Sequence, residues 1–156
     1  MPDFTSYLRP PAASVGRPPV LPAELYSGII KNWEVGDNNQ NKTPYVRYHI
    51  GLVDWPESVP ESARTTVGPD HQIYLIDLSK RQFRRDFFLT PDAYYRLTEF
   101  LQSCGIEVPL ENGVADFESS APQAVGCRIK VEIQVYTNQR TGEPGNQIGM
   151  IFGDQQ

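Results

Sequence analysis

The sequence predicts a mainly β domain of five strands and one helix, and three observations lead to this class. Apolar residues recur at every second position in several short segments, which is the period of a strand with one buried face. A single segment, residues 90–105, carries a start signal, a helical repeat and a stop signal. The first 22 residues hold six prolines and no apolar period, so they cannot form a regular backbone ladder.

Residues 24–53 predict a hairpin. The first strand, 24–35, is rich in aromatic and β-branched residues, and Gly28 allows a bend or bulge within it. Residues 36–42, GDNNQNK, are turn formers. The second strand, 44–53, alternates cleanly between two faces. Its expected core face is Val46, Tyr48, Ile50 and Leu52, and its expected outward face is Tyr45, Arg47, His49 and Gly51.

The middle of the chain predicts a loop and then a third strand. Residues 54–70 are rich in proline, serine and charge, which indicates a long loop with room for one helical turn. Residues 71–78 fit a short strand. We expect the third main strand at 82–89, where Phe83, Arg85, Phe87 and Leu89 alternate against Arg84, Asp86 and Phe88. The phase of this strand is ambiguous, and a helix beginning at Ser79 is the alternative.

The one predicted helix is TPDAYYRLTEFLQSCG, residues 90–105. Thr90 can cap it with its hydroxyl, Pro91 suits the first helical position, and Gly105 ends it. The apolar stripe that should cover a sheet is Tyr94, Leu97, Phe100, Leu101 and Cys104.

After the helix, residues 107–125 read as an irregular acidic connection. The clearest strand in the chain, 127–136, follows, and a polar turn leads to the fifth strand at 146–152 with Ile148, Met150 and Phe152 on one face. The order is therefore three strands, a helix and two strands. That is the order of the OB-fold, a five-stranded, partly open barrel that binds ligands across its second and third strands.

Size and composition allow one domain with tails. We expect a Pro-rich arm at 1–22, either a disordered leader or an arm packed on the domain or a partner, the OB-fold-like domain at 23–154, and a short tail at 155–156. No apolar run approaches the roughly 20 residues that span a membrane, and a secretory signal is lacking, so cytosol is the expected compartment. Cys104 and Cys127 lie in apolar patterns and are expected in the core.

Aromatic and basic residues fall where an OB-fold binds its ligand. Bases of a single strand stack on exposed rings while guanidinium groups neutralise phosphates. The net charge of −5 argues mildly against nucleic acid, but four basic residues lie within positions 80–85. The candidate nucleic-acid-binding residues from the strands and the two hairpin loops are Trp33, Lys42, Tyr45, Arg47, His49, Lys80, Arg81, Phe83, Arg84, Arg85, Tyr136 and Arg140. The alternative is that these rings are partly buried and the arginines protect a strand edge.

Other chemistry finds little support in the sequence. A phosphate-binding loop is absent, and the glycines of GEPGNQIG lie between two strands. A structural zinc site would need His49, His71, Cys104 and Cys127 to converge from distant positions. We therefore expect no catalytic residues, no metal and no cofactor.

Three segments carry a resemblance to a known family: LPAELYSGIIKNWEVGDNNQNKTPYVRYHIGLVDWP, RRDFFLTPDAYYRLTEFLQSCGI and VGCRIKVEIQVYTNQRTGEPGNQIGMIFGD. In these the chain resembles small phage-encoded single-stranded-DNA-binding-like proteins with a predicted OB-fold. The resemblance implies a non-enzymatic protein that coats single-stranded DNA in replication or recombination in the host cytoplasm, with phage or host replication proteins as partners. The ending FGDQQ lacks the acidic, aromatic-tipped tail through which many such proteins recruit enzymes.

The second function that the sequence leaves open is a phage structural or protein-interaction β-barrel without nucleic-acid affinity, in which the Pro-rich arm makes contacts between subunits. The sequence does not decide between a monomer and a homo-oligomer.

Overall fold

The computed structural model describes residues 5–10, 12, 18–40 and 42–154. At its centre lies a five-stranded antiparallel sheet with the strand order β5-β2-β1-β8-β9, which confirms the mainly β class. The strands of this sheet are β1 (Glu24–Asp37), β2 (Pro44–Asp54), β5 (Gln82–Phe88), β8 (Arg128–Thr137) and β9 (Pro144–Gly153).

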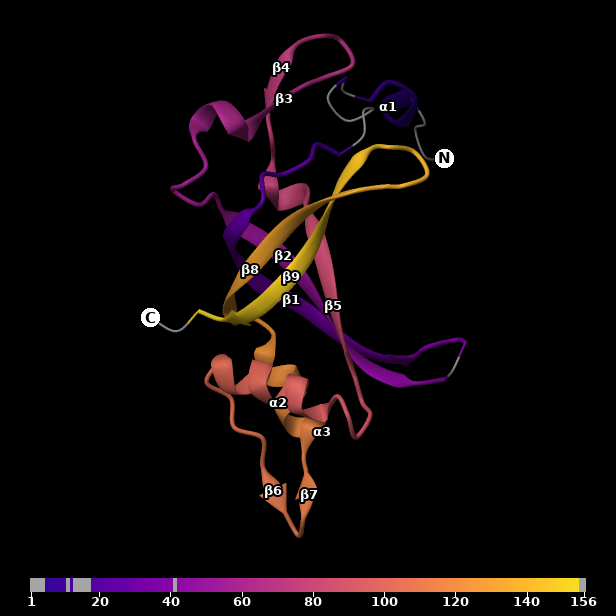
Figure 1. The fold of residues 1–156 in the computed structure, drawn as a ribbon, viewed down its shortest axis with the longest axis vertical. Helices are drawn as coiled ribbons and strands as arrows, with labels where there is room; N and C mark the ends of the chain where they lie inside the picture. The colour runs from indigo at the N-terminus through magenta and orange to yellow at the C-terminus, as the bar shows by residue number, and fades with distance from the viewer. Residues whose placement is uncertain (1–4, 11, 13–17, 41, 155–156) are drawn as a thin grey trace.

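Smaller elements lie at the two ends of the molecule. They are α1 (Thr5–Leu8), β3 (Thr65–Val67), β4 (Ile73–Leu75), α2 (Tyr94–Ser103), β6 (Leu110–Glu111), β7 (Val114–Ala115) and α3 (Phe117–Ser120). Figure 1 shows an elongated molecule with the large sheet in the middle, the β3–β4 hairpin at one end, and α2, α3 and the β6–β7 hairpin at the other.

The β1–β2 hairpin follows the prediction. The expected core face of β2 is buried, and every member is at most 5% exposed. The register between the two strands shifts at Gly28, where a bulge was expected. A second shift, after Ile30, places Trp33 opposite Tyr48, so that Trp33 packs on the core side of the sheet.

The sheet is open between its two edge strands. β5 pairs with β2 and β9 pairs with β8, and within the described residues no backbone ladder joins β5 to β9. The side chain of Arg85 crosses the gap instead and donates to the carbonyl oxygens of Ile148 and Gly149. We call this gap the seam. The expected barrel is therefore present only as a five-stranded sheet, and the described residues form no closed barrel.

β9 departs from the prediction in its phase. Its register with β8 shifts between Val131 and Ile133, and both Ile148 and Ile151 consequently pack against the core. Met150, which was expected on the same face as Ile148, is 65% exposed. A bulge in the middle of β9 therefore exchanges the two faces of the strand.

Helix α2 begins later than predicted. Residues 90–93 form a turn in which the Thr90 carbonyl accepts hydrogen bonds from the backbone N–H groups of Ala93 and Tyr94. The helix has no side-chain N-terminal cap, so the prediction of a Thr90 cap was wrong. Three of the five residues of the predicted apolar stripe are buried, which confirms this part of the stripe. Leu97, Phe100 and Leu101 are buried against the sheet.

The connections contain more structure than the sequence indicated. Residues 54–70 hold the expected helical turn, a 3-10 turn at Glu61–Arg64, and β4 confirms the short strand expected at 71–78. The strand β3 was not predicted, and it pairs with β4 in a hairpin. The connection expected to be irregular, 107–125, contains the β6–β7 hairpin and α3. The alternative of a helix beginning at Ser79 was wrong, because only a 3-10 turn, Leu78–Lys80, precedes β5.

Part of the predicted arm packs on the domain. Leu21 is fully buried, and its backbone N–H and C=O both bond to the side chain of Asn146 on β9 at 2.7 and 2.9 Å. We call residues 18–22 the N-terminal strap. Residues 1–4, 11 and 13–17 of the predicted arm and the tail at 155–156 lie outside the described residues.

Both cysteines are free thiols, half-buried and packed against the core, as expected. Burial, together with the neighbouring Cys127, raises the pKa of Cys104 to about 11. The Cys104 thiol is therefore not an activated nucleophile in this setting.

Candidate nucleic-acid interface

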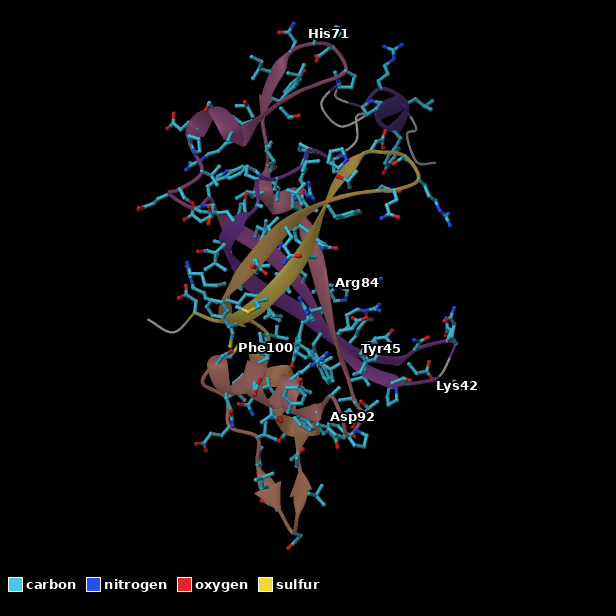
Figure 2. All side chains as sticks on the ribbon, viewed as in Figure 1. Lys42, Tyr45, His71, Arg84, Asp92 and Phe100 are labelled. Carbon is cyan, nitrogen blue, oxygen red and sulfur yellow. The ribbon has the colours of Figure 1, made fainter. Side chains whose placement is uncertain are left out.

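The outward side chains of β1, β2 and β5 line up in rows across the three strands. Strand pairing places these rows in register, and we call the nine residues the outer face. The rows are Asn32, His49 and Arg84; then Glu34, Arg47 and Asp86; then Gly36, Tyr45 and Phe88. In Figure 2, Tyr45 lies toward the β1–β2 hairpin that carries Lys42, and Arg84 lies nearer the middle of the sheet.

The third row is an aromatic platform. The rings of Tyr45 and Phe88 meet edge to face with centroids 6.4 Å apart. The Tyr45 ring lies across Gly36, where a Cβ would stand only 2.7 Å from the phenol oxygen. Phe88 is 40% exposed, so this row offers ring surface to a flat ligand.

The second row is a network of ion pairs. Arg47 donates to both carboxylate oxygens of Asp86 at 2.7 and 3.0 Å, and it lies 3.5 Å from Glu34. The hydrogen bond to Asp86 raises the pKa of Arg47. The same guanidinium lies 4.6 Å from the ring centroid of Tyr45. The charge of Arg47 is therefore balanced within the protein, and this residue supports the platform.

The first row holds the available cation of the outer face. The Nε2 atom of His49 lies 3.1 Å from the Oε1 atom of Glu34. Arg84 is exposed, and no carboxylate in the part of the chain that the structure describes forms an ion pair with it. A phosphate that approaches this face therefore meets one uncompensated guanidinium.

The basic cluster expected at positions 80–85 is divided between two faces. Lys80 ends a 3-10 turn and is exposed. Arg81 turns toward the strap, where it donates to the Pro19 carbonyl and to Asn146. Phe83 and Arg85 point toward the seam, whereas Arg84 lies on the outer face, because neighbouring residues of a strand alternate.

The remaining predicted residues lie at the edges of the sheet or behind it. Trp33 is on the core side and does not reach the outer face. Lys42 lies in the β1–β2 turn, while Tyr136 and Arg140 belong to the β8–β9 hairpin. Figure 1 shows these two hairpins extending near opposite ends of β5.

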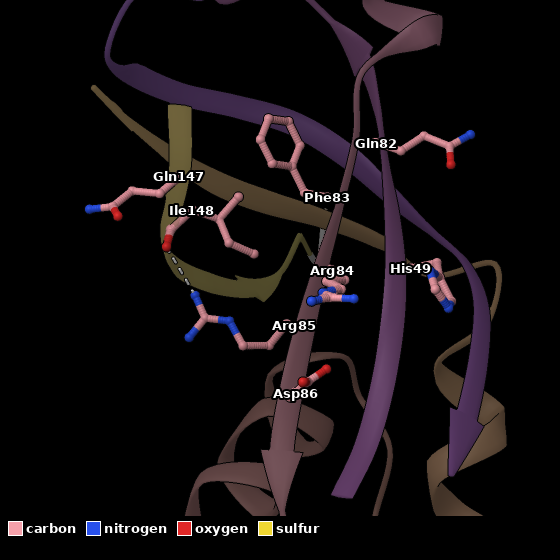
Figure 3. Close-up of a pocket in the computed structure, with 8 residues that line it drawn as sticks. All are labelled: His49, Gln82, Phe83, Arg84, Arg85, Asp86, Gln147 and Ile148. Atoms are coloured by element: carbon pink, nitrogen blue, oxygen red, sulfur yellow. Dashed lines mark hydrogen bonds between the residues drawn. The ribbon is translucent and has the colours of Figure 1, made fainter. Parts of the chain in front are cut away.

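A hollow of about 700 Å³ lies along the edge of β5 and connects the outer face with the seam. Figure 3 shows Arg85 extending toward Ile148 with Phe83 beside it, while His49 lies on the other side of β5. The residues that line this hollow are His49, Gln82, Phe83, Arg84, Arg85, Asp86, Gln147 and Ile148. Its volume is that of a typical small-ligand site.

Sequence reasoning missed Phe88, Glu34 and Asp86 as members of the outer face. Phe88 had been placed in the strand without a role, although its alternation with Phe87 indicated that one of the two rings faces outward. The partners of Arg47 had no sequence signal, because Asp86 is 39 residues away and only strand register brings it opposite.

Within the described residues, no helix is long and apolar enough to cross a membrane. The same part of the chain holds no group of three or more His, Cys, Asp or Glu side chains placed to bind a metal ion. No protein-family model matches the sequence, and no curated protein is significantly similar to it.

Proposed function

We propose that this chain is a non-enzymatic, phage-encoded protein with an OB-fold-like domain that binds single-stranded DNA. The order of strand pairing supports this proposal. Numbered as five main strands, the sheet runs 3-2-1-4-5, and the seam separates strands 3 and 5, which is where an OB barrel closes or stays partly open. Helix α2 follows the third of these strands and precedes the fourth, as in that fold.

The observation that carries the function is the aromatic platform beside Arg84. Tyr45 and Phe88 lie on the second and third main strands, the strands whose outer face binds oligonucleotides in OB-folds. A base stacked on an exposed ring contributes about 1–3 kcal/mol to binding. Arg84 lies on the same face of β5, four residues along the strand, and supplies charge for the backbone.

Electrostatics on this face predict a modest dependence on salt. Glu34 and Asp86 balance Arg47, so that Arg84 and the loop residues Lys42 and Arg140 are the cations left for phosphates. Each phosphate neutralised on a single strand contributes about 0.7 to the slope of log affinity against log salt. We therefore expect a slope of about 2 for these three contacts, and stacking as the larger contribution.

The test is fluorescence anisotropy with a labelled thirty-nucleotide single strand and with the matching duplex, in a salt titration. Tyr45→Ala is expected to weaken single-strand binding about tenfold or more, because one stacking surface is lost. Tyr74→Ala is the matched control, since Tyr74 is a half-buried tyrosine on β4, in the hairpin at the end of the molecule away from the outer face, and its hydroxyl bonds to Asp70. Circular dichroism verifies that each variant is folded. Equal binding by the parent and Tyr45→Ala would refute the platform as the site.

The second candidate function is a structural protein that assembles with copies of itself. One face of the β3–β4 hairpin presents Val67, Ile73 and Leu75, which are 64%, 73% and 79% exposed. Exposed aliphatic patches of this kind mark contact surfaces. This function predicts no single-strand binding at low salt and a sedimentation coefficient that rises with concentration, and Ile73→Ser should reduce that rise.

A further inference from the structure

Arg85 carries a positive charge into the seam without a negative partner. It is half-buried, and its recorded partners are the carbonyl oxygens of Ile148 and Gly149. Within the described residues, no carboxylate lies in ion-pair distance of its guanidinium. Burial lowers the pKa of Arg85, and the neighbouring Arg96 lowers it further. A charge held this way attracts an anion from solution.

The Arg85 guanidinium has donors to spare. Both recorded hydrogen bonds use Nη2, and in the described structure neither Nε nor Nη1 has a partner. No side-chain nitrogen of the described residues is both fully buried and unpaired, so these donors face solvent. A guanidinium presents its N–H groups as a fork that fits two oxygens of one phosphate.

Two hollows meet at Arg85. The first, of about 700 Å³, also contains Arg84 and opens to the outer face. The second, of about 310 Å³, lies between the seam and α2 and contains Arg96. Two acidic residues line these hollows. Asp86 is paired with Arg47, and Glu99 lies on α2. Among the described residues Glu99 forms no ion pair, so three arginines face one unpaired carboxylate along this path.

Aromatic and apolar side chains accompany the three arginines. Phe83 lines the first hollow, and Phe100, Phe152 and Met150 line the second. The path therefore repeats the combination of rings and cations found on the outer face, and β5 separates the two. Because β5 is an edge strand, a ligand on the outer face reaches the seam by passing over one strand only.

We infer that the seam is a second binding segment, in which Arg85 and Arg96 hold a backbone phosphate of a single strand that leaves the outer face at Arg84. This inference rests on the proposed function, since it extends the same ligand from the outer face toward α2. It adds Arg96 to the binding residues and gives Arg85 a role on the opposite side of β5 from Arg84.

The experiment measures the salt dependence of binding to a labelled thirty-nucleotide strand for the parent and four variants. Arg96→Ala removes an exposed side chain that hydrogen-bonds to its neighbour Tyr95, so the variant is expected to fold. Loss of one phosphate contact lowers the slope by about 0.7, which corresponds to about fivefold weaker binding at 0.1 M salt relative to 1 M. Arg96→Lys keeps the charge and should keep the slope.

Arg85→Gln tests the half-buried member, because glutamine keeps one N–H donor for the β9 carbonyl oxygens and removes the charge. We expect the same loss of about 0.7 in slope. Arg128→Ala is the charge-matched control, since Arg128 is exposed on β8 and lines neither hollow. Thermal unfolding verifies that Arg85→Gln is folded, and Arg96→Ala decides the question if it is not.

The outcomes separate the two proposals. If the parent binds, Tyr45→Ala weakens binding and both seam variants keep the slope of the Arg128→Ala control, the seam is not a binding segment and the proposed function stands. If the parent binds no single strand at low salt, the proposed function is refuted and the seam segment with it. A slope reduced in both seam variants and unchanged in Arg128→Ala supports the seam.

Discussion

Two buried tyrosines place hydroxyl groups inside the core. The Tyr26 hydroxyl donates to the Pro22 carbonyl and the Tyr48 hydroxyl to the Ala121 carbonyl, both at 2.8 Å. Both residues are fully buried, and both hydroxyls are satisfied, so neither costs the fold an unpaired polar group. A neutral phenol is stable in this buried setting, whereas burial disfavours the charged phenolate. It raises the pKa of Tyr48, and it raises the pKa of Tyr26 to about 12.

The first prediction concerns stability in alkali. In the unfolded chain Tyr26 ionises near pH 10, whereas in the folded protein its pKa is about 12. The unfolded state therefore holds fewer protons between these values, and the free energy of unfolding falls as pH rises from 10 to 12. The loss from this residue is up to about 2.7 kcal/mol.

Tyr26→Phe removes this contribution. Urea unfolding of the variant should show about 1 kcal/mol lower stability at pH 7, where the hydrogen bond to Pro22 is lost, and a shallower decline above pH 10. Other groups that titrate in this range are shared by both proteins, so the difference isolates Tyr26. Parallel declines in the two proteins would show that burial does not shift its pKa.

The sequence indicated a group of aromatic and basic residues on neighbouring strands, but not the face of the sheet toward which each side chain points. Arg84 and Arg85 are neighbours of one type, and only strand phase sends one to the outer face and the other to the seam. The phase of β5 could not be read because phenylalanine and arginine occur on both of its faces. Trp33 was displaced for a related reason, since a bulge after Ile30 reverses the alternation of β1.

At the scale of elements, α2 is defined more by its end than by its beginning. Gly105 has φ of +80°, its N–H bonds to the Gln102 carbonyl at 3.0 Å, and the next N–H, of Ile106, bonds to the Leu101 carbonyl at 2.9 Å. These two bonds are those of a Schellman motif, and buried Ile106 supplies its apolar contact. The N-terminus has no comparable device.

The second prediction compares the two ends of α2. Gly105→Ala should lower the free energy of unfolding by about 1 kcal/mol, because alanine is strained at positive φ. Thr90→Ala should change it by less than about 0.5 kcal/mol, since the Thr90 hydroxyl caps nothing. Urea unfolding measures both. If Thr90→Ala lowered the free energy of unfolding more than Gly105→Ala does, Thr90 would be the helix cap that the sequence predicted.

The elements that the sequence predicted are those long enough to show a period. Strands β1, β2 and β8 have ten or more residues, and the core face of β2 was predicted residue by residue. β4 lies within the short strand predicted at 71–78, but β3 and the two strands of the β6–β7 hairpin, with three and two residues, are too short for any alternation to be recognised. β9 is long enough, but its bulge breaks the period in the middle.

At the scale of the whole molecule, the N-terminal strap joins the two sides of the seam. Arg81, just before β5, donates to the Pro19 carbonyl, and Asn146 of β9 bonds to the backbone of Leu21. Arg81 and Asn146 also contact each other at 3.2 Å. At one end of the seam the strap thus connects β5 and β9, which no backbone ladder joins in the described part of the chain. The sequence could not predict this packing, because one leucine among prolines gives no apolar period that would mark residues 18–22 as part of the core.

The last prediction tests whether the strap belongs to the domain. Leu21→Ala should lower the free energy of unfolding by about 2–5 kcal/mol, because Leu21 is fully buried and its removal leaves a cavity in the core. Leu8→Ala is the matched control in the same predicted arm. Leu8 is 79% exposed on α1, so its change should stay within about 0.5 kcal/mol. Urea unfolding of both variants at one pH gives the comparison. A domain that begins at β1 would tolerate the two substitutions equally, whereas a domain that includes the strap loses much of its stability with Leu21 alone.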